Sequence, residues 1–495
     1  MNKKNYVAVA TLAFAMLTSC AGQKEAKSTS GIDLANMDTT VSAGTDFFRY
    51  ACGGWNDAHP LTAEYSRYGT FDELFENSQK QLRELIEGLA AQKNNQAGSA
   101  AQKIGDLYNM AMDSVTLNKQ GAEPVKAMLD KIAGMKDKSE IVPMMTEMAH
   151  IGIGTYFHSY VYADPKNSSL NIFQMGQGGI NLGEKEYYLD TDSITQNIRE
   201  QYKLYIGKLF QLAGFSEADA QQKVADVMEI ETAIAKVSRS ATELRDPEAN
   251  YHKMSFDELK KTIAGIDWDA YMKGLGIQAP AELNVEQVEP IQEVARLMNT
   301  LPLSKHVSYL EYNLLDAAAS CLSDDFVAAR FDFYGKVLSG RQVNQPRWKR
   351  AVNSVNGMLG ELVGEMYVEK YFPAAAKERM VKLVKNLQTA LGERIDAQEW
   401  MSDSTKIRAH EKLATFHVKV GYPDKWKDYS KLEIKNDSYW ANVCRASEWG
   451  FNDMYSRIGK PVDKDEWLMT PQTVNAYYNP STNEICFPAA ILQPP

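Results

Sequence analysis

Apolar residues at spacings of three and four recur along most of this chain, and this periodicity limits the fold more than any other feature. In "KERMVKLVKNLQTALGERI" the stripe consists of Met380, Leu383, Val384, Leu387, Leu391 and Ile395. Comparable stripes run through 71–91, 100–116, 224–237, 303–320 and 345–371. Because an α-helix has 3.6 residues per turn, these stripes predict helices that turn their apolar faces to a core. A mainly α-helical protein is therefore expected.

Two shorter regions have the alternating pattern of strands. The segment "TYFHSYVYADPKNSSLNIFQM" alternates on both sides of a polar turn and predicts a hairpin around 155–175. A second hairpin is expected near the end, where Asn479-Pro480-Ser481-Thr482 turns the chain. Before it, the polar and aromatic stretch 418–437 is typical of a connection between lobes, and a helix is expected around 438–458.

The balance of charge argues against one class of partner. The chain has 495 residues, with 54 Lys and Arg against 64 Asp and Glu, a net charge of −10. A surface of this sign repels phosphates, and no compact basic stripe opposes it, so no nucleic acid partner is predicted.

The first residues resemble a bacterial lipoprotein signal. A Lys pair at 3–4 precedes an apolar run that is too short for a permanent membrane span, and "LTSC" ends at Cys20. We expect a signal peptide at 1–19, cleavage before Cys20, acylation of that cysteine, and a flexible tether at 20–45. The alternative is a plain secretory signal with an accidental cysteine. Acylation would make this a lipid-anchored protein of the cell envelope, on the periplasmic side or the outer surface of the outer membrane.

The residue patterns predict no metal or nucleophile site. In "HEKLATFH" the second histidine lies seven residues after the first, whereas a zinc-binding helix needs H-E-x-x-H, with both histidines on one face. The other five histidines stand alone, and the cysteines form no C-x-x-C pair. No metal site can therefore be read from these residues.

Asn475 has a more interesting position, in the first strand of the terminal hairpin. An outward Asn beside Ala476 on a strand edge could bind an extended peptide, because the backbone adds a strand and the amide both donates and accepts. From the pattern alone, an ordinary hairpin asparagine is the alternative.

Several segments resemble, in order, the neprilysin and endothelin-converting-enzyme family of zinc endopeptidases, whose bacterial members include endopeptidase O. They are "DFFRYACGGW" (46–55), "SRYGTFDEL" (66–74), "LGEKEYYL" (182–189), "RDPEANYHKMSFDEL" (245–259), "FDFYGKVLSGR" (331–341), "PRWKRAVNSVNGMLGELVGEMYVEKYF" (346–372) and "MTPQTVNAYYNP" (469–480). The likeness extends from about residue 45 to the end.

The resemblance implies a large helical lobe with a small β-hairpin at 46–425 and the start of a gluzincin-type catalytic lobe at 426–495. It implies that Asn475 binds the substrate backbone and that Ala476 pairs with it through its main chain. The family's H-E-x-x-H helix follows this strand, so one zinc, its ligands and the catalytic Glu are expected beyond Pro495. The Cys of "YACGGW" pairs with a later cysteine in animal members, so Cys52 is expected to be unpaired.

We therefore expect a zinc-dependent metalloendopeptidase that hydrolyses small to medium peptides in the cell envelope, represented by a portion that is inactive alone. The alternatives are a non-catalytic helical binding lipoprotein and a pseudo-peptidase.

Overall fold

The computed structural model describes residues 33–494, which fall into two units, 33–62 and 63–494. The first unit contains the 3-10 helix η1 (Leu34–Asn36) and the helix α2 (Phe47–Ala58). Its charged residues meet at Arg49, which forms ion pairs with Asp38 at 2.8 Å and Asp57 at 2.7 Å. Part of the predicted tether thus contacts the helix that follows it.

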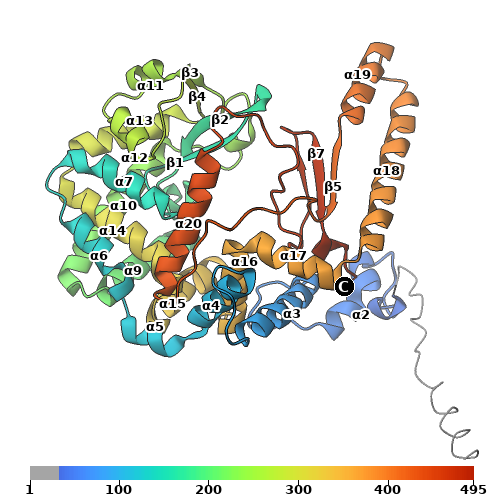
Figure 1. Cartoon of the computed structure of the whole chain (residues 1–495), viewed down its shortest axis with the longest axis horizontal. Helices are drawn as coiled ribbons and strands as arrows, with labels where there is room; N and C mark the ends of the chain where they lie inside the picture. The colour runs from blue at the N-terminus through green and yellow to red at the C-terminus, as the bar shows by residue number, and fades with distance from the viewer. Residues whose placement is uncertain (1–32, 495) are drawn as a thin grey trace, which may run out of the picture. The chain divides into compact units, whose positions relative to one another are not determined.

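The second unit is mainly α-helical, as the stripes predict (Figure 1). Its helices up to the first sheet are α3 (Thr70–Ala90), α4 (Ala100–Met112), α5 (Ser114–Gln120), α6 (Glu123–Ala133), η2 (Lys138–Glu140) and α7 (Ile141–His150). Next come α8 (Glu186–Leu189), α9 (Ser193–Leu212), α10 (Glu217–Val237), η3 (Glu243–Arg245), α11 (Phe256–Thr262), α12 (Trp268–Gly274), α13 (Val288–Thr300), α14 (Leu303–Ala318) and η4 (Ala319–Cys321). The last are α15 (Asp324–Arg330), the π-helix η5 (Phe331–Leu338), α16 (Arg347–Met358), α17 (Gly360–Tyr371), α18 (Ala374–Asp396), α19 (Asp403–Ala414), α20 (Tyr439–Tyr455) and η6 (Ala489–Leu492).

Most stripes form the core. α14 packs against α6, α9 and α10, and buried residues lie on nearly all of its sides. The single stripe at 345–371 forms two helices, α16 and α17, because Leu359 leaves helical geometry at φ −120° and ψ 31°. Periodicity therefore predicted the helices but not this break.

One stripe is not a core face, and that prediction was wrong. In α18 only Val384 is buried, whereas Leu383, Leu387 and Leu391 are 47%, 59% and 51% exposed. α19 and strand β5 are the main packing partners of α18, and α18 and α19 lie side by side as a helical pair (Figure 1). Within 63–494 these two partners leave the leucine face uncovered.

Two small sheets complete the second unit. The first has the order β1 (Phe157–Asp164), β2 (Asn167–Gln177), β4 (Glu282–Val285), β3 (Lys253–Ser255), and its antiparallel β1–β2 pair confirms the hairpin predicted at 155–175. The second has the order β5 (His417–Gly421), β7 (Glu484–Pro488), β6 (Tyr477–Asn479). Its β6–β7 pair confirms the terminal hairpin.

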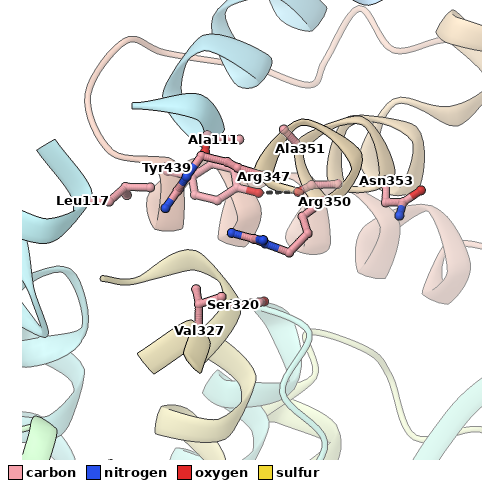
Figure 2. Close-up of a pocket in the computed structure, with 10 residues that line it drawn as sticks. Ala111, Leu117, Ser320, Val327, Arg347, Arg350, Ala351, Asn353 and Tyr439 are labelled. Carbon is pink, nitrogen blue, oxygen red and sulfur yellow. Dashed lines mark hydrogen bonds between the residues drawn. The ribbon is translucent and has the colours of Figure 1, made fainter. Parts of the chain in front are cut away.

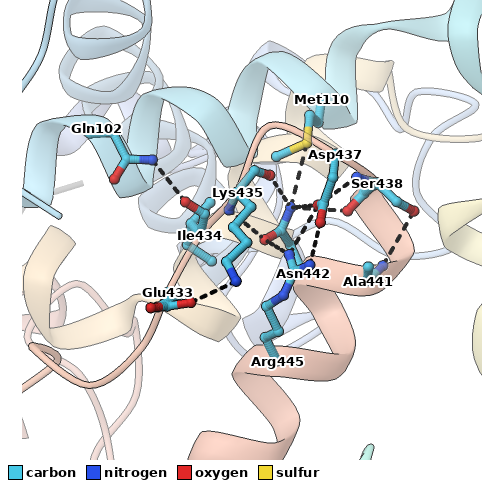
Figure 3. Close-up of polar contacts among 10 residues, drawn as sticks. All are labelled: Gln102, Met110, Glu433, Ile434, Lys435, Asp437, Ser438, Ala441, Asn442 and Arg445. Atoms are coloured by element: carbon cyan, nitrogen blue, oxygen red, sulfur yellow. Dashed lines mark hydrogen bonds and ion pairs between the residues drawn. The ribbon is translucent and has the colours of Figure 1, made fainter. Parts of the chain in front are cut away.

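The predicted connection at 418–437 begins as strand β5, and its later part is held by hydrogen bonds (Figure 3). Asn442 on α20 is fully buried, and its Nδ2 donates to the carbonyls of Lys435 at 2.7 Å and Ser438 at 2.9 Å. The backbone N–H of Lys435 donates back to Asn442 Oδ1 at 2.9 Å. From α4, Gln102 donates to the Ile434 carbonyl at 2.9 Å. This segment is therefore fixed to two helices, while the predicted boundary between 425 and 426 stays a prediction.

The predicted signal peptide and Cys20 lie outside the described residues. Across 33–494, no helix has both the length and the apolar content that crossing a bilayer requires.

Candidate functional site

The terminal hairpin places β6 at the edge of its sheet. β7 lies in the centre, parallel to β5 and antiparallel to β6, with Tyr477 opposite Cys486 and Asn479 opposite Glu484. The turn closes through Asn483, whose φ of 52° is in the left-handed region that Asn tolerates better than most residues. Among the described strands none pairs with the outer edge of β6, so its backbone can pair with an added strand.

Asn475 and Ala476 come immediately before β6, not within it. Asn475 is exposed, and its backbone N–H donates to the Thr473 carbonyl at 3.0 Å. Its side-chain Oδ1 accepts from the Ala476 N–H at 2.8 Å, whereas Nδ2 has no hydrogen-bond partner among residues 33–494. Asn475 thus presents a free amide donor to solvent. A peptide carbonyl that pairs with the Ala476 N–H would have to displace the Asn475 side chain.

One face of this sheet is fixed by a buried ion pair. Lys419 on β5 forms an ion pair with Glu484 on β7 at 2.7 Å, and both side chains are at most 3% exposed. Lys419 also donates to the Glu466 carbonyl at 2.6 Å, and the Tyr477 hydroxyl donates to Glu484 at 2.9 Å. Burial raises the pKa of Tyr477 far above its usual value, so this hydroxyl stays a donor. These contacts fix the position of β6.

The opposite face of the sheet is aromatic and open. Tyr478 is 45% exposed and stacks on Phe416, with ring centroids 5.9 Å apart and an interplanar angle of 9°. Its hydroxyl donates to Asn483 at 3.2 Å. A peptide bound along β6 would therefore find an apolar surface beside the strand edge.

A cavity of about 440 Å³ adjoins the hairpin on its buried face. Asn479 lines it and donates to the Tyr162 hydroxyl on β1 at 2.6 Å, which joins the two sheets. Its lining includes Arg457, which forms ion pairs with Glu466 and Asp453.

The described residues do not fit a catalytic zinc. Such a site needs three protein ligands around an open position. In the part of the chain from 33 to 494, no three His, Cys, Asp or Glu side chains gather in that way. His410 lies on α19 beside Asp396, at 2.7 Å, and His417 lies on β5 at 3.5 Å from Asp465. No hydrolytic step can be derived from these residues.

Reasoning from the sequence missed the residues that hold the edge strand, Lys419, Glu484 and Tyr162. The alternation in "HVKVG" places Lys419 and His417 on one face, but the identity of the buried face depends on what packs there. Only the three-dimensional structure brings the carboxylate 65 positions later to that lysine.

Comparison with known proteins gives a consistent result. Residues 43–423 match the model of peptidase family M13. Endothelin-converting enzyme 1 of Rattus norvegicus is 30% identical over 487 residues, which cover 93% of this chain and 62% of the relative. An endothelin-converting enzyme homolog of Locusta migratoria is 29% identical over 490 residues, 93% of this chain and 67% of the relative. The chain therefore spans about three-fifths of the length of the Rattus norvegicus enzyme.

Solved structures agree in fold. The zinc metalloprotease Zmp1 of Mycobacterium tuberculosis, in complex with an inhibitor, has a TM-score of 0.88 at 36% identity and covers 94% of this chain and 70% of its own. PepO of Lactobacillus rhamnosis has a TM-score of 0.80 at 21% identity, a likeness in fold alone.

Proposed function

Because this chain belongs to peptidase family M13, we propose that it forms the substrate-binding part of a zinc-dependent metalloendopeptidase that acts on small to medium peptides. The observation that carries this proposal is the open edge of β6, with exposed Asn475 at its start. An extended peptide would pair with β6 through backbone hydrogen bonds, and the free Nδ2 of Asn475 would donate to a peptide carbonyl.

The chemistry of hydrolysis would come from outside the described residues. A bound zinc would polarise the scissile carbonyl and activate water. The role of this chain's residues would be to hold the peptide, with β6 supplying backbone pairing and Tyr478 and Phe416 an apolar wall. We expect the 495-residue chain alone to bind peptides without cleaving them.

Peptide binding by the 495-residue chain tests this proposal. Fluorescence polarisation with a labelled, extended decapeptide should give saturable binding. Asn475→Ala should weaken it about five- to tenfold, because one or two hydrogen bonds to the backbone are lost. Asn386→Ala, an exposed asparagine on α18, is the matched control and should change nothing. Equal affinity in wild type and Asn475→Ala would contradict the assigned role, and no binding to any peptide would favour a pseudo-peptidase or another binding protein.

Location in the cell envelope is the second part of the proposal. Acylation of Cys20 would hold the protein to a membrane, since each buried methylene contributes about 0.8 kcal/mol. Metabolic labelling with a palmitate analogue should mark the wild-type protein and not Cys20→Ala, which should leave the membrane fraction. Labelling that survives the substitution would exclude this anchor.

A further inference from the structure

A second cavity, of about 370 Å³, lies between α16, α20 and the segment that carries Ser320 and Val327 (Figure 2). None of its lining residues belongs to the sheet beside Asn475. Its volume falls within the range of about 300–1,000 Å³ that small-molecule sites occupy. The lining is divided between two arginines with neighbouring hydroxyls and a set of aliphatic side chains.

The two arginines differ in how their charge is compensated. Arg347 forms an ion pair with Asp324 and donates to the Ala111 carbonyl at 3.1 Å. Arg350, one helical turn further along α16, donates to the Gln345 carbonyl, and no carboxylate among the described residues lies within ion-pair distance of it. In Figure 2 its guanidinium extends into the space between α16 and the segment with Ser320 and Val327. Arg350 therefore brings into the cavity a positive charge that has no ion-pair partner among residues 33–494.

The surroundings of Arg350 make this arrangement unfavourable without an anion. Burial and the like charge of Arg347 lower the pKa of Arg350, and Asp324 opposes this only in part. A partly buried charge without a partner is costly, and a guanidinium matches the oxygens of a carboxylate or phosphate with two parallel hydrogen bonds. The cavity thus has the charge and geometry that suit an oxyanion.

The remaining lining indicates what else the ligand carries. Among residues 33–494 the Ser320 hydroxyl has only one long contact, 3.8 Å to Cys321 Sγ, whereas the Tyr439 hydroxyl is already hydrogen-bonded to Ser354. Leu117 and Val327 supply an apolar surface. We propose that this cavity binds a small organic anion, with its phosphate or carboxylate head on Arg350 and Ser320 and a short apolar tail against Leu117 and Val327.

Isothermal titration calorimetry of the 495-residue chain at low salt tests the proposal with inorganic phosphate, butyl phosphate and pentanoate. The two alkyl probes should bind in a saturable way, and butyl phosphate should bind about tenfold more tightly than phosphate because its tail buries apolar surface. Whichever of butyl phosphate and pentanoate binds more tightly identifies the head group. Arg350→Gln should weaken all three probes about tenfold or more.

Two further variants complete the design. Arg379→Gln removes an exposed arginine on α18 and should bind as wild type does, which controls for net charge. Val327→Phe keeps Arg350 but fills the apolar part, so it should weaken butyl phosphate more than phosphate, and it keeps the test valid if Arg350→Gln does not fold. No saturable binding, binding by folded Arg350→Gln within twofold of wild type, or equal losses in Arg350→Gln and Arg379→Gln would each overturn the proposal. Peptide binding at β6 is measured separately, so the failure of one site does not imply failure of the other.

Discussion

Helices α14 and α18 have similar apolar stripes in the sequence and opposite positions in the structure. α14 lies inside the helical body, where ten of its residues are buried, whereas α18 has Val384 as its only buried residue. Periodicity thus determines which face of a helix is apolar, while burial depends on what packs on that face. The same contrast between an enclosed body and an open helical pair extends to charged residues.

The largest difference in stability is expected between breaking a buried ion pair and breaking an exposed one. Lys419→Met leaves the Glu484 carboxylate buried without its cation and should lower the free energy of unfolding by about 3–5 kcal/mol. In α19, Arg408 pairs with Glu411 at 2.7 Å but is 80% exposed, so Arg408→Met should cost less than about 0.5 kcal/mol. Urea unfolding of both variants measures the difference. Similar losses would mean that the Lys419–Glu484 ion pair is not buried.

Replacing a leucine in each of the two stripes should change the free energy of unfolding by amounts that differ nearly as much. Leu310 on α14 is fully buried, and Leu310→Ala should cost about 2–5 kcal/mol because it removes apolar contacts and leaves a cavity. Leu387→Ala on α18 makes the same chemical change at an exposed position and should shift stability by no more than about 0.5 kcal/mol. A comparable loss at Leu387, again by urea unfolding, would show that the α18 stripe is covered in the 495-residue chain.

A buried carboxyl in the body should make stability depend on pH. Glu231 on α10 is fully buried and accepts hydrogen bonds from Asn181 at 2.7 Å, Tyr188 at 2.7 Å and Tyr202 at 2.9 Å. Burial raises its pKa to about 7, which the three hydrogen bonds only partly offset.

The sign of the pH effect follows from that shift. Between about pH 4.5 and 7 the unfolded chain loses this proton while the folded chain keeps it, so the stability contributed by Glu231 falls as the pH rises. Glu231→Gln does not titrate, and its stability relative to wild type should therefore increase by about 2–3 kcal/mol between pH 4.5 and 7.5. Urea unfolding at several pH values measures this, with the exposed Glu378→Gln of α18 as a control. A pH-independent difference for Glu231→Gln would contradict the raised pKa.

Sequence patterns predicted the helices and both hairpins because these follow from local spacing and turn residues such as Asn479-Pro480. Asn475 was expected within the first strand of the terminal hairpin, but β6 begins only at Tyr477, so the prediction was two residues off. The edge character of β6 depends on which strands pair, and β5 lies some 60 residues earlier in the chain. Partners that are distant in sequence, such as Lys419 and Glu484 or Arg350 and the Ser320 segment, carry no local signal. Burial of the α18 stripe was predicted wrongly for the same reason.

The smallest difference in stability is expected between two variants of α18 itself, one at its buried residue and one at its exposed leucines. Val384→Ala removes the one buried side chain of this helix and should cost about 1–2 kcal/mol, at about 0.8 kcal/mol per buried methylene. The triple change Leu383→Ala, Leu387→Ala and Leu391→Ala removes far more apolar volume but should alter the free energy of unfolding by less than about 1 kcal/mol, because these side chains are exposed and alanine favours helix. The triple variant should also bind less of the dye ANS in the native state, since exposed apolar surface is lost. If the triple variant were the less stable of the two, the leucine stripe would have a packing partner within the chain, and the distinction between α18 and α14 would disappear.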